Sequence, residues 1–310
     1  MSNRLVKNKS ASVHQKLLTI AKETKRPFDE VLQYYGMERF LYRLSRSAHK
    51  DTFVLKGALL FRAWDYLDSR ATRDIDLLAY ADNSLDAIET IMREVCATNV
   101  LDDGLLFNES TTNAIRIKKD ADYEGVRIQL KSQLGPARIH LQIDVGFGDT
   151  IHPEAVETTY PALLDQSAPT IRAYPPETVV AEKVEAMISL GALNSRMKDF
   201  YDVLRLAQQF SFQGEVLCES LTLTLNNRNT QIIDFAELTE ELTNNKNLDI
   251  QWAAFLRKSD LNGPQGFSEV LSAIGVFVEP ILSAIKKDTQ YKGHWAPSDG
   301  WSDRSHRGRS

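Results

Sequence analysis

The stretch LKGALL (residues 55–60), followed by TRDIDL (residues 72–77), decides the fold. The second segment predicts a strand, in which Asp74 and Asp76 point to one face while the apolar residues beside them point to the other. Two adjacent carboxylates repel each other unless a cation lies between them. Mg²⁺ favours carboxylate oxygens and usually brings substrate phosphates with it. The pair therefore predicts metal-assisted handling of a nucleoside triphosphate.

The upstream turn is the candidate phosphate site. Gly57 allows backbone amides to approach an anion, and a helix beginning at Ala58 would direct its N-terminal amides there. Lys56 adds a charge beside the turn, and Thr72 shares the face of the two aspartates. We expect Lys56, Gly57, Ala58 and Thr72 to bind the nucleotide, although a glycine turn between a strand and a helix is common without any ligand.

Three segments further along alternate apolar and polar residues, at about 115–118, 126–131 and 139–145. Short loops join them, so we expect an antiparallel meander with one buried face and one polar face. Asp144 lies on that polar face and completes a candidate metal triad with Asp74 and Asp76. The basic residues expected to project there, and to track an RNA backbone, are Arg116, Lys118, Arg127 and Lys131.

The chain divides by pattern into four parts. We expect an N-terminal helical cap over residues 1–50, a small α/β core over 51–168, an all-helical domain over 169–288 and a disordered tail over 289–310. The fold class is therefore α+β, a small mixed or antiparallel sheet packed with helices, followed by a helical C-terminal domain.

Composition narrows the class of protein. The chain has 310 residues, 43% hydrophobic and 25% charged, with a net charge of −5. These values are ordinary for a soluble globular protein and leave room for a local basic groove. Two cysteines make no disulfide framework, and the N-terminus has no apolar signal segment, so we expect a cytoplasmic protein with no membrane span.

Two residues of the helical region are further candidates. Lys183 lies in a helix after Pro175-Pro176 and could place a point charge on a triphosphate. Asp199 lies three residues before Asp202 on one helix face and could orient Lys183 or a nucleophile. A solvated lysine and a carboxylate favoured by the helix dipole are the simpler interpretations of each residue alone.

Taken together, these blocks resemble the AbiEii/AbiGii toxin family of the nucleotidyltransferase superfamily related to DNA polymerase beta. The resemblance covers roughly residues 30 to 210, with every block in order: 55–60, 70–77, 143–144, 174–183 and 195–202. It implies the toxin of a bacterial toxin–antitoxin pair, some of which act in abortive infection and antiviral defence. One departure is Ala58, because the family usually has Gly-Gly or Gly-Ser at this turn.

The resemblance also implies the chemistry. Asp74 and Asp76 would hold Mg²⁺, in a site with room for two ions, Lys183 would contact the NTP, and Asp199 would be a further essential acid. The expected reaction transfers nucleotides to RNA, at the tRNA 3′ acceptor end, and blocks translation. A cognate antitoxin is the implied partner. Two alternatives stay open: an NTP-binding regulator without transfer activity, and a phosphotransferase that modifies a protein partner.

Overall fold

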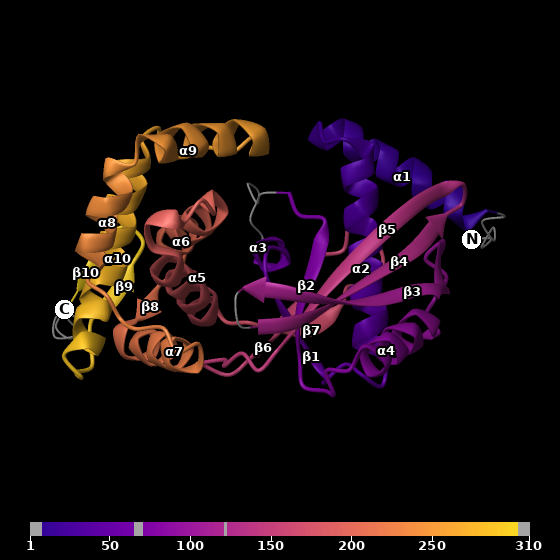
Figure 1. The fold of residues 1–310 in the computed structure, drawn as a ribbon. Helices are drawn as coiled ribbons and strands as arrows, with labels where there is room; N and C mark the ends of the chain where they lie inside the picture. Colours follow the sequence, from indigo (N-terminus) through magenta and orange to yellow (C-terminus); the bar gives the residue numbers. More distant parts are fainter. Residues whose placement is uncertain (1–7, 65–70, 121–122, 303–310) are drawn as a thin grey trace, which may run out of the picture. The chain divides into compact units, whose positions relative to one another are not determined.

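The computed structural model describes residues 8–64, 71–120 and 123–302, and the chain forms two compact units (Figure 1). The first, here called the sheet unit, comprises the chain up to Gly148 together with Val156–Ala173. The second, the helical unit, comprises Asp149–Ala155 and the chain from Tyr174 onward. The chain therefore enters the helical unit, returns to the sheet and leaves it again.

A seven-stranded mixed sheet is the centre of the sheet unit, with strand order β3-β4-β5-β2-β1-β7-β6. β2 runs parallel to β5 and β1 runs parallel to β7, and the other neighbours are antiparallel. The strands are β1 (Phe53–Lys56), β2 (Asp74–Ala79), β3 (Leu105–Asp120), β4 (Tyr123–Leu134), β5 (Ala137–Phe147), β6 (Val156–Thr159) and β7 (Thr170–Ala173).

Four helices belong to the sheet unit: α1 (Lys9–Thr24), α2 (Phe28–Arg46), α3 (Leu59–Ala63) and α4 (Leu85–Ala97). Pro27 precedes α2, and Ser84 caps α4 by accepting a hydrogen bond from the Ala87 amide. α2 packs against β5 and α4 packs against β3, so both cover the same apolar face of the sheet. The opposite face carries the polar residues.

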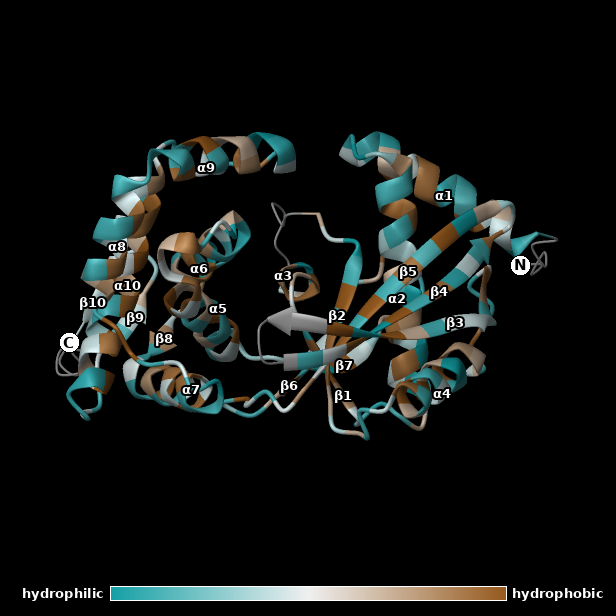
Figure 2. Cartoon of the chain, viewed as in Figure 1, coloured by the Kyte–Doolittle hydropathy of each residue, from teal (hydrophilic) through white to brown (hydrophobic). Residues whose placement is uncertain are grey.

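Hydropathy follows this division along the strands (Figure 2). Ile75 and Leu77 of β2, and Ile143 and Val145 of β5, are fully buried, while the residues between them are more polar. The meander predicted for β3, β4 and β5 is confirmed by their antiparallel pairing. β6 and β7 were not predicted as strands. Each spans only four residues, and both lie in the segment that connects the predicted α/β core to the helical region.

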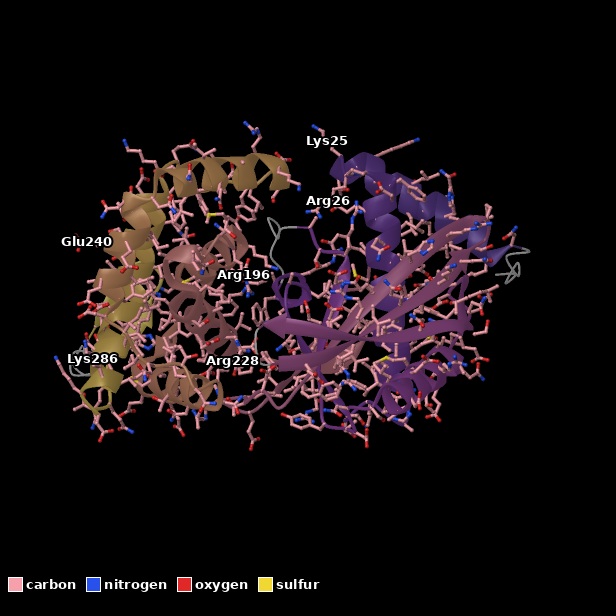
Figure 3. The ribbon with its side chains drawn as sticks, in the orientation of Figure 1. Lys25, Arg26, Arg196, Arg228, Glu240 and Lys286 are labelled. Carbon is pink, nitrogen blue, oxygen red and sulfur yellow. The ribbon has the colours of Figure 1, made fainter. Side chains whose placement is uncertain are left out.

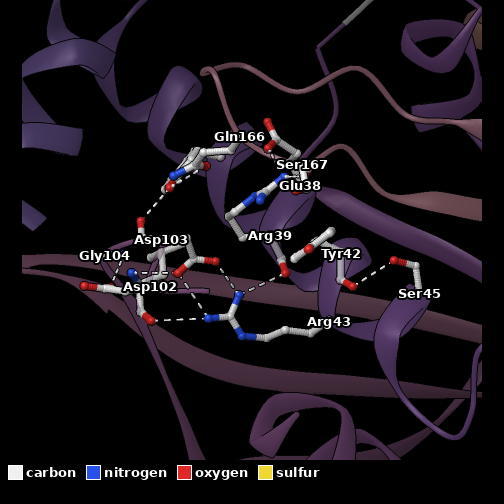
Figure 4. Close-up of polar contacts among 12 residues, drawn as sticks. Glu38, Arg39, Tyr42, Arg43, Ser45, Asp102, Asp103, Gly104, Gln166 and Ser167 are labelled. Carbon is white, nitrogen blue, oxygen red and sulfur yellow. Dashed lines mark hydrogen bonds and ion pairs between the residues drawn. The ribbon is translucent and has the colours of Figure 1, made fainter. Parts of the chain in front are cut away.

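A buried polar network fixes the loops of the sheet unit to α2 (Figure 4). Arg43 forms a two-pronged ion pair with Asp103, at 2.7 and 3.1 Å. Arg39 contacts Glu38 and donates a hydrogen bond to the Ser167 carbonyl at 2.8 Å. Burial raises the pKa of Glu38, against the opposing attraction of Arg39. The network therefore anchors both the entry to β3 and the loop between β6 and β7.

The helical unit packs around one long apolar helix, α10 (Phe267–Lys286). This is the one helix of the described residues that is long and apolar enough to cross a membrane. It packs instead against α6, α7 and α8, and Phe277 and Val278 are fully buried, as in the core helix of a globular domain. The other helices are α5 (Pro176–Leu190), α6 (Met197–Gln209), α7 (Gly214–Asn227), α8 (Phe235–Asn244) and α9 (Lys246–Ser259), with a 3₁₀ turn at Gly191–Leu193.

The segment after α10 corrects one expectation. Residues 289–302 were predicted to be disordered, but they carry β9 (His294–Ala296) and β10 (Gly300–Ser302), which form a small sheet with β8 (Phe212–Gln213). Trp295 is buried against Phe277 and donates a hydrogen bond to the Ala207 carbonyl at 2.6 Å. Trp301 donates to the Phe277 carbonyl at 2.8 Å. The rest of the predicted tail, residues 303–310, lies outside the described residues.

The predicted fold class is confirmed. The chain combines a small mixed sheet, covered on one face by helices, with a helical C-terminal region. The expected helical cap at residues 1–50 corresponds to α1 and α2, which pack within the sheet unit.

Candidate active site

Strand pairing places the first candidate residues in one row across the sheet. Lys56 of β1 is in register with Asp76 of β2, and Asp76 is in register with Asp144 of β5. Asp144 is in turn in register with Arg127 of β4. Residues directly opposite on paired strands share a face, so these four side chains form a row of cation, anion, anion and cation. We call it the charged row.

Both aspartates of β2 are accessible. Asp74 and Asp76 are half-buried, whereas Ile75 between them is fully buried. Lys56 is only 7% exposed, which is unusual for a lysine and places its charge close to the sheet. The alternation predicted for this strand therefore directs the two carboxylates away from the helix-covered face.

The turn after β1 lies directly beside the second aspartate. Gly57 has a φ of +74°, and a Cβ at this position would overlap the Asp76 carboxylate. Only glycine combines that conformation with so close an approach. Ala58 is buried and precedes α3, which has five residues. The turn and Asp76 are thus direct neighbours, although the helix that follows the turn is short.

Arg127 holds the third carboxylate of the predicted triad. Its Nε and one terminal nitrogen each lie 2.8 Å from a different oxygen of Asp144, which is 4% exposed. The hydrogen bond to Asp144 raises the pKa of Arg127, and the negative charges of Asp74 and Asp76 raise it further. A metal-ligand role for Asp144 would therefore use the lone pairs that Arg127 leaves on the carboxylate.

The possible metal ligands support a site of two carboxylates better than the predicted triad of Asp74, Asp76 and Asp144. In the described part of the chain, no group of three or more His, Cys, Asp or Glu side chains is arranged to hold a metal ion. Asp74 and Asp76 remain as two accessible carboxylates on one strand face. Mg²⁺ commonly binds to one or two carboxylates plus substrate phosphates, so this pair fits such an ion.

The basic face expected for RNA is only partly assembled. Arg127 and Lys131 lie on the polar face, where Lys131 is exposed and in register with His140. Arg116 is in register with Val126, so it lies on the opposite face, and it donates a hydrogen bond to the Asn83 carbonyl at 2.9 Å. The strand register reverses the expected direction of Arg116. Lys118 has its side chain outside the described residues.

A groove of about 810 Å³ opens beside Asp74. The N-terminal part of α2 lines it together with residues 71–74, β4 and β5. Gln33 on α2 donates hydrogen bonds to the carbonyls of Arg73 and His140, at 3.2 and 3.0 Å, and so holds two of these segments together. Thr72 lines the groove, and its amide donates to the Tyr34 hydroxyl at 3.1 Å. This groove was not predicted.

The candidate residues of the helical unit form a cluster of their own between α5 and α6. Lys183 Nζ lies 2.9 Å from Asp199 Oδ1 and 2.8 Å from Asp202 Oδ2, and both carboxylates are almost fully buried. Arg196, labelled in Figure 3, contacts the other oxygen of Asp199 at 2.6 Å. Asp202 was grouped with Asp199 by spacing, but its direct contact with Lys183 was not predicted.

Two opposing effects set the charge of Asp199. Burial raises the pKa of its carboxyl, but the nearby Lys183 ammonium and Arg196 guanidinium outweigh burial and hold the pKa below its ordinary value. The carboxylate is therefore ionised at neutral pH, and it holds the lysine of α5 in a defined position.

The sequence matches a family model described as the nucleotidyl transferase AbiEii toxin of a type IV toxin–antitoxin system, over residues 39–273. No curated protein matches the chain. Among solved structures, a candidate nucleotidyltransferase from H. pylori is 15% identical, with 82% of this chain and 95% of that chain covered and a TM-score of 0.41. JHP933 from Helicobacter pylori is 14% identical, with 81% and 90% covered and a TM-score of 0.40. The family match spans most of the chain, and the protein belongs to the AbiEii family of nucleotidyltransferase toxins.

Proposed function

We propose that this protein transfers a nucleotide from an NTP to the 3′ end of an RNA, with the acceptor end of tRNA as the target, and so blocks translation. The observation that supports this most is the position of Asp76. It lies in register between Lys56 and Asp144 and directly against the Gly57 turn. A carboxylate pair and a phosphate-compatible turn are thus adjacent on one accessible face.

The reaction follows from the chemistry of the acceptor and the donor. A 3′ hydroxyl oxygen of the RNA forms a bond to the α-phosphorus, and the bond from that phosphorus to the bridging oxygen breaks. Pyrophosphate leaves, and the hydroxyl proton is released to water. Attacking and leaving oxygens lie roughly in line in such transfers, so positioning and charge neutralisation account for most of the catalysis.

Asp74 and Asp76 would hold Mg²⁺, which would supply positive charge to the phosphate oxygens and polarise the attacking hydroxyl. Lys56, close to the sheet and beside the Gly57 turn, supplies a fixed cation for the phosphates, and the backbone of the turn replaces the serine hydroxyl that Ala58 lacks. Thr72, two residues before β2, is a further candidate contact.

Lys183 is proposed to neutralise charge on the triphosphate. Its contacts with Asp199 and Asp202 fix the ammonium in place, so little side-chain freedom would be lost when a phosphate binds. Asp199 is proposed as an essential acid through this hold on Lys183. Membership of a type IV toxin–antitoxin family implies a cognate antitoxin, and we place both reaction and partner in the cytoplasm.

The decisive experiment is transfer of label from an α-labelled NTP to total cellular RNA, with Mg²⁺ present and each of the four NTPs tried in turn. We expect label in RNA with the unmodified protein and roughly 100-fold or more less with Asp76→Asn. Glu240→Gln, at an exposed position of α8 outside the charged row and the groove, is the matched control for the loss of one negative charge. Absence of transfer with every NTP would refute the proposal.

Three companion experiments, on nucleotide binding, on γ-labelled NTP and on growth, separate the alternatives. Nucleotide that binds and stays intact after long incubation would indicate a regulator that senses NTP. Label from the γ-phosphate on a protein would indicate a phosphotransferase. Growth inhibition that survives Asp76→Asn would separate toxicity from this site.

A further inference from the structure

The groove beside Asp74 is floored by a second row of polar side chains. Asp74 of β2 is in register with Gln142 of β5, Gln142 with Gln129 of β4, and Gln129 with Asn113 of β3. All four line the groove. We call Gln142, Gln129 and Asn113 the amide row. It runs beside the charged row, two residues along each of β2, β5 and β4.

The two aspartates therefore have different surroundings. Asp76 lies against the Gly57 turn, whereas Asp74 opens into the groove. If phosphates of the NTP occupy the turn, the attacking hydroxyl must approach from another side, because attacking and leaving oxygens lie in line through the α-phosphorus. The groove provides that approach, and it leads to the aspartate pair.

We propose that the groove beside Asp74 is the acceptor subsite, in which the amide row binds the 3′-terminal nucleosides of a single-stranded RNA. This inference rests on the proposed function. The volume of about 810 Å³ falls within the range of roughly 300–1,000 Å³ that is usual for small-ligand pockets. The amide side chains both donate and accept hydrogen bonds, so they match base edges and the ribose 2′ hydroxyl.

The charge balance of the groove favours an acceptor over a triphosphate. Its lining includes the cations Arg73, Lys131 and Arg138, and also the carboxylates Asp29, Glu30 and Asp74. A lining with equal numbers of positive and negative side chains suits an RNA strand, whose phosphates are well separated, better than an NTP with its dense negative charge. Arg138 and Lys131 are exposed and available to an RNA backbone.

The test measures binding of a short single-stranded RNA with a free 3′ hydroxyl and a fluorescent 5′ end to the full chain, by anisotropy. The variant replaces Gln129 and Gln142 with Leu, which keeps side-chain size but removes the hydrogen bonds. We expect about tenfold weaker RNA binding and unchanged NTP binding, which also shows that the variant is folded. The matched control is Gln133→Leu, an exposed glutamine of β4 outside the groove lining.

Three results of the binding measurement would overturn the inference: no RNA binding by the unmodified protein, equal RNA affinity in the double variant and the control, or an equal loss of NTP and RNA affinity. The last result would assign the groove to the nucleotide. The label-transfer assay reports on the proposed function separately. Transfer that persists with an unchanged RNA KM in the double variant would refute the subsite and leave the function standing.

Discussion

A single glycine shows how much of the site depends on one position. Gly57 could be recognised from the sequence as a turn, and Asp76 as half of a carboxylate pair. Their proximity could not, because it depends on the antiparallel register of β1 and β2, which pairs Lys56 with Asp76. The ion pair between Arg127 and Asp144 was hidden for the same reason. The sequence was therefore enough to select candidate residues, but it did not show which residues on neighbouring strands they contact.

Gly57→Ala should disrupt the site through a steric clash. A methyl group there would overlap the Asp76 carboxylate, and the φ of +74° adds strain for any residue with a Cβ. We expect a loss of about 2–4 kcal/mol in the free energy of unfolding, together with loss of label transfer. Denaturant unfolding and the transfer assay measure the two effects.

Gly148→Ala is the matched control. Gly148 has a φ of +75°, and among the described residues no atom beyond its chain neighbours lies within 4 Å of the position that a Cβ would take. The variant should show the backbone strain alone, about 1–2 kcal/mol, and retain transfer. Equal loss of transfer in both variants would contradict a specific role for the contact between the turn and Asp76.

Elements were predictable to different degrees. Long amphipathic segments such as α2 and α4, and the meander from β3 to β5, follow directly from their periodicity. β9 and β10 could not be predicted in this way, because the glycine, proline and polar residues around them give this segment a composition typical of a disordered tail. Their order depends on the burial of Trp295 against α10, a tertiary contact that no local pattern records. The direction of Arg116 was missed because a register shift between Asn108 and Asn113 of β3 is invisible in its alternation.

The helix pair α5 and α6 should make stability depend on pH through Asp199. Its folded-state pKa lies below the ordinary value of 3.8, so its contribution is fully present above that pH and is lost as the pH falls through the lowered pKa. Asp199→Asn should cost roughly 3 kcal/mol at pH 7, because it removes one partner of Lys183 and Arg196. The difference in stability between Asp199→Asn and the unmodified protein should become smaller below about pH 4.

Thermal unfolding midpoints between pH 7 and pH 3 measure this effect. Glu240→Gln, on an exposed position of α8, controls for the loss of one negative charge. Parallel curves for the unmodified protein and Asp199→Asn would show that the carboxylate is not stabilised by its two cations.

At the scale of the whole molecule, the chain crosses from the sheet unit to the helical unit, back and across again. The first crossing segment, Asp149–Ala155, is held in the helical unit by hydrogen bonds and ion pairs. The His152 amide donates to the Thr178 hydroxyl at 3.1 Å. Asp149 forms an ion pair with Arg228 at 3.1 Å. The two units are therefore not two consecutive segments, and no single cut in the chain separates them.

Arg228→Met should loosen this crossing segment. Arg228, labelled in Figure 3, also contacts Glu182 at 3.3 Å and Glu185 at 2.7 Å, so three carboxylates share one cation whose side chain is 16% exposed. Burial lowers the pKa of Arg228, but these carboxylates outweigh it and raise the pKa. Without the cation the three carboxylates repel one another where little water reaches them, and we expect a loss of about 3–5 kcal/mol in the free energy of unfolding.

Hydrogen exchange of the amides in residues 149–155 reports on the segment itself, and denaturant unfolding gives the total cost. Adding Glu185→Gln to Arg228→Met removes one of the three negative charges and should restore part of the stability. Lys286→Met, which breaks an exposed pair with Asp234 at 3.7 Å, should cost less than about 1 kcal/mol. If Arg228→Met unfolds like Lys286→Met and leaves exchange unchanged, the Arg228 cation does not hold the crossing segment, and the contacts of His152 with Thr178 and Glu219 become the candidates for its anchor.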